Sequence, residues 1–136
     1  MVITMRRAGN RAGFTLIELM IVIVLVMILA GIAMVQYRNS VLHGKEVVLQ
    51  TNLLRMRDAI DQYYADKGRY PASIDALVSE RYLRDVPLDP LTGRSDTWVT
   101  EAADPDPSNQ SGGPGIYNIR SGADGTAING TRYSTW

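Results

Sequence analysis

One acidic side chain stands out because it lies at the start of a long apolar run. Glu18 is the only charged residue between Phe14 and Tyr37, and the 17 residues from Leu19 to Val35 contain no charged side chain. A carboxylate in lipid is costly, about 2.5–3.5 kcal/mol for Asp at a helix centre and less near the interface. An acid in such a segment usually has a partner.

Few other residues have the types or spacing that chemistry requires. The chain has no Cys, which excludes a disulfide scaffold, a zinc ribbon and a cysteine nucleophile. The single histidine, His43, excludes sites that need two His ligands. No nucleophile–base pair, metal cluster or phosphate loop is evident, so we predict that the protein is not an enzyme.

The charges are balanced overall but unevenly distributed along the 136 residues. There are 14 Lys and Arg against 14 Asp and Glu, which argues against a nucleic-acid partner. The first 13 residues contain Arg6, Arg7 and Arg11 and no acid; the rest of the chain has 11 basic and 14 acidic side chains. A basic head, an apolar stretch and a mildly acidic body fit a membrane protein whose head is cytoplasmic.

The apolar stretch from Phe14 to Val35 is long enough to span a bilayer, which needs roughly 20 helical residues. Three interpretations compete. The segment is a secretory signal cut near Gly31-Ile32-Ala33, an uncleaved anchor, or an anchor in which Glu18 has a special role. The first two leave Glu18 without a use.

The string Arg11-Ala12-Gly13-Phe14-Thr15-Leu16-Ile17-Glu18-Leu19 resembles the class III signal of type IV pilins and type II secretion pseudopilins. The resemblance implies that a prepilin peptidase cuts after Gly13 and that the new N-terminal Phe14 is N-methylated. It also implies that Glu18 of an incoming subunit pairs with the amine of a neighbour's Phe14. Many relatives carry a kinking Pro where this chain has Val35.

The next segment has helical periodicity. Its apolar residues recur at intervals of 7, 4, 3, 4 and 3, which is typical of one face of an amphipathic helix. No strong breaker precedes Gly68 and Pro71, so we expect one helix from Phe14 to Asp66. The stripe should hold a small domain onto the helix; it consists of Leu42, Leu49, Leu53, Met56, Ile60 and Tyr63.

Further elements are expected downstream. Ser73–Glu80 is predicted to be a short helix capped by Ser73. The turn-rich segment Tyr82–Gly93, Tyr-Leu-x-x-x-Pro-x-Asp-Pro-x-x-Gly, resembles that of the major, G-type pseudopilins. Strands are predicted at 96–101, 116–120 and 131–135, with a Pro- and Gly-rich loop at 102–115.

The same resemblance raises the question of calcium. G-type pseudopilins hold a calcium ion in a C-terminal loop, and Ser121–Gly125 with the terminal Trp136 matches part of that motif. The later Asp pair is absent, so Asp124 is the one carboxylate on offer, with Asn129 and backbone carbonyls beside it. Calcium at Asp124 and a metal-free Gly-rich turn are both open.

Together these patterns predict an α+β fold of the type IV pilin kind: a long N-terminal helix, membrane-spanning in its first half, packed against a small antiparallel sheet. Residues 1–13 would be a cleaved leader, residues 14–37 a transmembrane and assembly helix, and residues 38–136 a periplasmic domain.

The resemblance implies a structural subunit of the type II secretion pseudopilus, which polymerises into a periplasmic filament that helps drive export across the outer membrane. The alternative is a type IV pilin for adhesion or twitching motility. The implied partners are other copies of the chain, the prepilin peptidase, other pseudopilins, inner-membrane secretion platform proteins and, before assembly, the lipid bilayer. The implied location is the bacterial inner membrane, with a single pass and the C-terminal domain in the periplasm.

Overall fold

The computed structural model describes residues 13–104 and 114–136. It divides into two compact units, Met1–Asn39 and Ser40–Trp136, and helix α1 (Leu16–Lys67) runs through both. Nearly all of the predicted leader, residues 1–12, and most of the predicted loop, residues 105–113, lie outside the described residues. Each unit is considered by itself below.

Helix α1 begins and ends where the sequence supplies helix caps. At its start, the hydroxyl of Thr15 accepts a hydrogen bond from the Glu18 backbone N–H at 3.3 Å. At its end, Gly68 adopts a left-handed φ of 68°, and its N–H donates to the Tyr64 carbonyl at 2.8 Å. The helix is unbroken past Val35, so the predicted continuous helix is confirmed within two residues at each end.

In the first unit, the described helix is apolar on all sides. Every residue from 13 to 39 is exposed, including all the large side chains between Leu16 and Val35. Among the described residues, α1 is the one helix that is long and apolar enough to cross a membrane.

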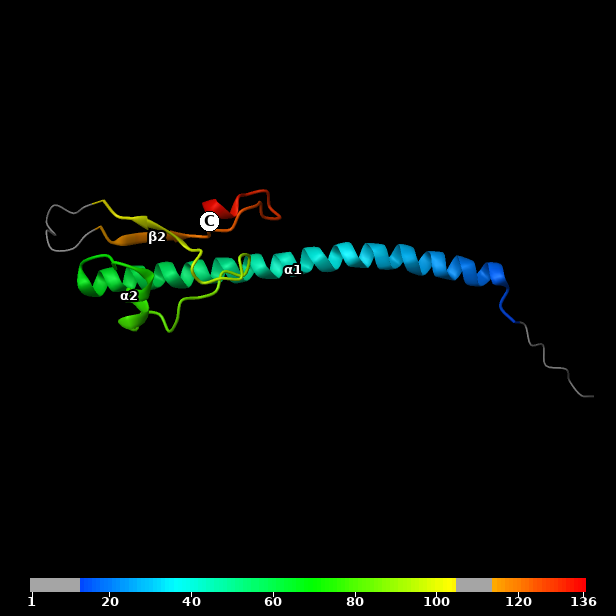
Figure 1. Cartoon of the computed structure of the whole chain (residues 1–136), viewed down its shortest axis with the longest axis horizontal. Helices are drawn as coiled ribbons and strands as arrows, with labels where there is room; N and C mark the ends of the chain where they lie inside the picture. Colours follow the sequence, from blue (N-terminus) through cyan, green and yellow to red (C-terminus); the bar gives the residue numbers. More distant parts are fainter. Residues whose placement is uncertain (1–12, 105–113) are drawn as a thin grey trace, which may run out of the picture. The chain divides into compact units, whose positions relative to one another are not determined.

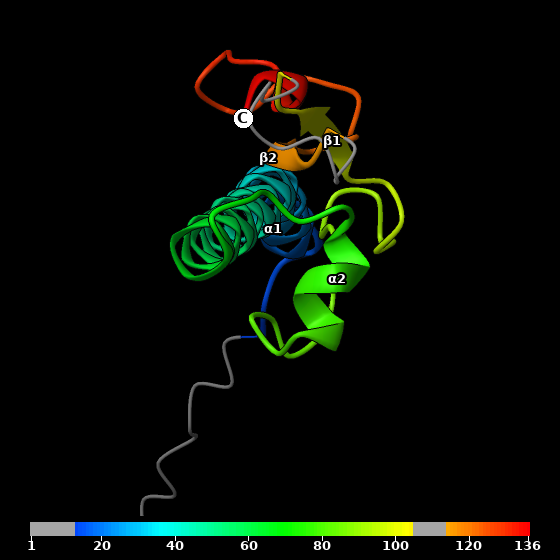
Figure 2. The same ribbon diagram turned by 90° about the vertical axis from the view of Figure 1, so that its left-hand side faces the viewer.

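The second unit is built around the amphipathic part of α1. Figures 1 and 2 show a two-stranded sheet along one side of it and helix α2 (Ile74–Ser79) on another. As predicted, Ser73 caps α2, because its hydroxyl accepts from the Ala76 N–H at 3.2 Å. The core joins side chains of α1 to Leu77 of α2 and to side chains from the C-terminal part of the chain; it comprises Leu49, Leu53, Met56, Ala59, Ile60, Tyr63, Leu77, Trp98, Ile116, Ile119, Ala123, Ala127 and Tyr133.

The sheet consists of β1 (Val99–Ala102) and β2 (Ile116–Arg120), which pair antiparallel. The register opposes Val99 to Arg120 and has an irregularity between Glu101 and Ala102. The guanidinium of Arg57 on α1 fixes the sheet to the helix, since it donates to Asn118 Oδ1 and to the Ile119 carbonyl, both at 2.9 Å. The α+β layout expected from the sequence is therefore present.

The third predicted strand, at 131–135, is wrong. The structure has one isolated bridge between Thr126 and Arg132, followed by the 3₁₀ turn η1 (Tyr133–Thr135). The local Thr and Tyr content favours a strand, but Tyr133 turns inward to a partner on α1. The backbone bends tightly to allow this, with positive φ at Gly125 and Gly130.

Candidate functional site

The three residues just before helix α1 have no regular secondary structure. Gly13, Phe14 and Thr15 precede the helix and are exposed, and the Phe14 side chain is 84% exposed. The Gly13–Phe14 peptide bond therefore lies just outside regular structure, where a protease can reach it.

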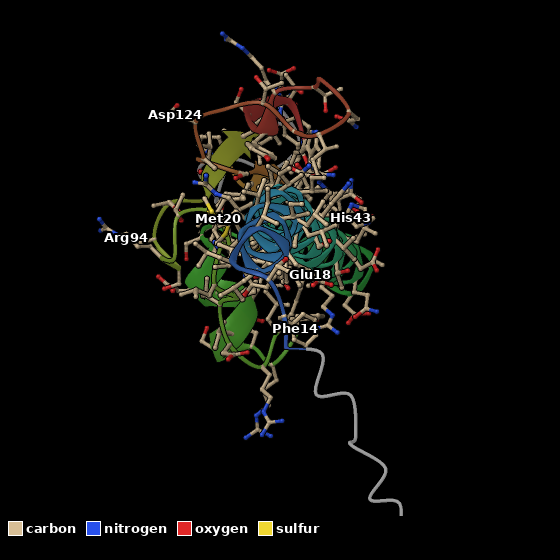
Figure 3. All side chains as sticks on the ribbon, turned by 90° about the vertical axis from the view of Figure 1, so that its right-hand side faces the viewer. Phe14, Glu18, Met20, His43, Arg94 and Asp124 are labelled. Atoms are coloured by element: carbon tan, nitrogen blue, oxygen red, sulfur yellow. The ribbon has the colours of Figure 1, made fainter. Side chains whose placement is uncertain are left out.

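Glu18 lies in the first turn of α1, close in sequence to that bond. A carboxylate there interacts favourably with the positive end of the helix dipole. Thr15 and Glu18 have the spacing of a capping box, and the Thr15 hydroxyl makes its half of it. Figure 3 shows Phe14 and Glu18 together at this end of the helix. The predicted site residues Gly13, Phe14 and Glu18 lie within six consecutive residues at the start of α1.

The helix that follows exposes a continuous apolar surface, which is unfavourable in water. Its Ile, Leu, Val and Met side chains between Leu16 and Val35 are 45–78% exposed. Contiguous apolar surface of this kind marks contact with lipid or with other protein. The arrangement is chemically simple: an exposed peptide bond before the helix, a carboxylate in the first helical turn, and an apolar helix.

Asp124 belongs to the second unit and lies on an exposed loop (Figure 3). It borders an open polar hollow of about 220 Å³, which is lined by Ala123, Asp124, Gly125, Thr126, Arg132 and Ser134. The charged Arg132 side chain contributes to the same lining. His43 is exposed on α1.

These residues do not fit a calcium site. Calcium takes six to eight oxygen ligands, usually including several carboxylates. Within residues 13–104 and 114–136, no three His, Cys, Asp or Glu side chains are grouped closely enough to hold a metal ion. The Asn129 side-chain oxygen is engaged, because it accepts from the Thr131 backbone N–H at 3.0 Å and from its hydroxyl at 2.7 Å.

Two buried acids were not identified from the sequence. Glu46 is 6% exposed, and its Oε1 accepts from the Tyr133 hydroxyl at 2.8 Å and the Ile128 N–H at 2.9 Å. Burial of the Tyr133 hydroxyl is the larger cause, and its hydrogen bond to Glu46 the smaller one, of a pKa of Tyr133 raised to about 12. A signal for Glu46 existed: it fills the seven-residue gap between Leu42 and Leu49 in the apolar stripe, at helical spacing from both.

The second buried acid is Asp89, which is fully buried in the turn-rich segment. Its Oδ2 accepts from the Ser121 hydroxyl at 2.7 Å and its Oδ1 from the Leu91 N–H at 2.8 Å. Its own backbone N–H donates to the Arg94 carbonyl at 2.9 Å. Asp89 therefore organises its own loop and joins that loop to the segment after β2.

The comparisons with known proteins agree with this layout. The family model described as the prokaryotic N-terminal methylation motif matches residues 9–34, which include the junction and most of the apolar helix. The fimbrial protein EcpC of Eikenella corrodens is 39% identical over 79 residues, 54% of this chain and 52% of EcpC, so the match spans about half of that relative. No solved structure matches the chain.

Two further relatives match over more of their length. The type II secretion system core protein G of Klebsiella michiganensis is 30% identical over 105 residues, 65% of this chain and 73% of the relative. The core protein G of Pseudomonas aeruginosa is 30% identical over 97 residues, 60% of this chain and 68% of the relative. With its N-terminal methylation motif, apolar helix and small α+β domain, the chain belongs to the family of type II secretion system core protein G.

Proposed function

We propose that this chain is a structural subunit of a type II secretion pseudopilus. The observation that carries the proposal is the extent of the likeness to core protein G, 105 aligned residues against the 26 of the N-terminal motif. The likeness therefore includes part of the domain as well as the signal that all pilin-like proteins share. In this role the subunits polymerise into a periplasmic filament that helps drive protein export across the outer membrane.

Maturation starts at the exposed junction. The prepilin peptidase cuts after Gly13, and the new amine of Phe14 becomes N-methylated. Before assembly the apolar helix lies in the inner membrane, with the second unit in the periplasm. The exposed side chains of residues 16–35 support this step, because they need lipid or neighbouring helices around them.

Assembly replaces lipid by sister helices. The Glu18 carboxylate of an incoming subunit pairs with the Phe14 amine of its neighbour, because both charges need a partner in an apolar bundle. The pairing sets the axial register of the filament. The role is structural, with no catalytic step in this chain, and other pseudopilins and the inner-membrane secretion platform complete the machine.

The test removes the Glu18 charge. Glu18→Ala should enter the membrane and lose its leader normally, as measured by fractionation and by the mass of the mature chain. It should yield no sheared or cross-linked filaments. The matched control is Glu80→Ala, which removes a glutamate that pairs with Lys67 at 2.8 Å in the second unit. A normal filament yield from Glu18→Ala would refute the pairing.

A type IV pilin serving adhesion or twitching motility is the second candidate, favoured by the 39% identity to the fimbrial protein EcpC. Deleting the gene separates the two. A secretion subunit is required for export of the strain's secreted enzymes, whereas a pilin is required for surface motility or attachment and leaves export intact.

A further inference from the structure

The buried carboxylate of Glu46 has no part in the role proposed above. It lies on the amphipathic part of α1, where it is only 6% exposed. A buried carboxylate is stable only where donors satisfy it. Its Oε1 has two, the Tyr133 hydroxyl and the Ile128 backbone N–H.

Both donors belong to the C-terminal segment, residues 121–136. They are 82 and 87 residues from Glu46 in sequence, so each bond joins the C-terminal segment to the N-terminal helix α1. Tyr133 is only 4% exposed, and its ring packs edge-on against Trp136 with centroids 5.4 Å apart. The carboxylate therefore lies where the segment meets the helix.

The segment has its own internal bonds, but these close its turn without reaching α1. The Ala127 N–H donates to the Thr131 carbonyl at 2.7 Å, and the Trp136 indole N–H donates to the Thr131 hydroxyl at 2.7 Å. Each of these bonds links two residues of the segment. Glu46 is the acidic residue of α1 whose contacts fasten the segment to the helix.

We propose that the buried carboxylate of Glu46, in place of a bound divalent cation, fastens the C-terminal segment of this chain to α1. A cation would need several carboxylates from the loop. The hollow in this loop is lined by one carboxylate, Asp124, and by the positively charged Arg132. Glu46 instead supplies the negative charge from the helix, and the loop supplies the donors. Docking of the segment is consequently independent of calcium.

Hydrogen exchange of the full chain in detergent micelles tests this, with peptides covering residues 126–136 as the readout. In the wild type, exchange in these peptides should be the same in excess chelator and in millimolar calcium. Glu46→Ala should speed exchange there by about 10-fold or more, because hydrogen bonds to a buried charge are lost. The matched control Glu80→Ala removes a partly exposed acceptor of the Tyr63 hydroxyl and should leave these peptides unchanged.

Two more variants make the result decisive. Asp124→Asn should behave as the wild type in both calcium and chelator. Tyr133→Phe keeps the ring and removes one bond to Glu46, so it should speed exchange in the segment while α2 exchanges normally, even if Glu46→Ala unfolds the domain. Faster exchange in chelator that Asp124→Asn abolishes would overturn the proposal. Unchanged exchange in both Glu46→Ala and Tyr133→Phe would overturn it as well.

Discussion

Replacing Asp89 with Ala should be among the most damaging single changes in the second unit. The side chain is fully buried, and each of its two oxygens accepts a short hydrogen bond, from Ser121 at 2.7 Å and from Leu91 at 2.8 Å. A third bond, from the Thr92 N–H, is longer at 3.4 Å. Alanine removes the acceptors but leaves the buried donors in place.

The cost follows from the two short bonds. A hydrogen bond to a charged group contributes about 1.5–3 kcal/mol to stability. This contribution is lost when the acceptor is removed and its donor stays buried. Asp89→Ala should therefore lower the free energy of unfolding by about 3–6 kcal/mol. A small domain has only about 5–15 kcal/mol in total, so a large part of its stability would be lost. Asp89→Asn keeps one acceptor oxygen and should lose about 1.5–3 kcal/mol.

Urea unfolding of the full chain in micelles, followed by tryptophan fluorescence, measures this loss. Trp98 is a suitable probe because its indole N–H donates to the Pro87 carbonyl at 2.8 Å, two residues from Asp89. Asp85→Ala is the matched control, since Asp85 is an exposed acid in the same loop. A loss below about 1 kcal/mol for Asp89→Ala would refute the assignment of Asp89 as the organising residue of this loop.

Further predictions concern packing, pH and maturation. Gly122→Ala would place a Cβ in steric overlap with the Thr97 carbonyl oxygen and should cost about 1–3 kcal/mol in urea unfolding. Gly44→Ala, with open space around it, should instead stabilise the helix by about 0.5–1 kcal/mol. Because the pKa of Tyr133 is raised to about 12 in the fold, its contribution is complete below pH 10 and is lost as the pH rises through about 12. In Tyr133→Phe, the melting temperature should therefore change less than in the wild type between pH 10 and about 12. Gly13→Leu should leave an unprocessed precursor, and a mature-sized band on mass analysis would place the cleavage elsewhere.

The helical parts of this fold are predictable because their signals are local. The apolar stripe from Leu49 to Tyr63 is buried as its spacing indicates, and Gly68 ends the helix one residue after Lys67. Ser73 caps α2 as expected. β2 is found at the predicted residues, whereas β1 begins at Val99 rather than Asp96.

The parts that escaped prediction depend on residues far apart in sequence. Thr and Tyr favour a strand at 131–135 locally, but the partner of Tyr133, Glu46, is 87 residues away in sequence. Asp89 and Ser121 are 32 residues apart, and no local pattern shows that they meet. For the N-terminal site, the motif alone predicts Gly13, Phe14 and Glu18, because the signal is one short continuous string.

The position of the Thr15 cap has a consequence for the mature chain. Thr15 follows the Gly13–Phe14 bond, and its hydroxyl and carbonyl accept from the N–H groups of Glu18 and Leu19. Among the described residues, both of these bonds thus lie on the part of the chain that the proposed cleavage after Gly13 would leave. Loss of the leader should therefore not unwind the first turn. Only Thr15 would separate the new N-terminal residue, Phe14, from the helix. The positive amine of Phe14 could then occupy only a small range of positions.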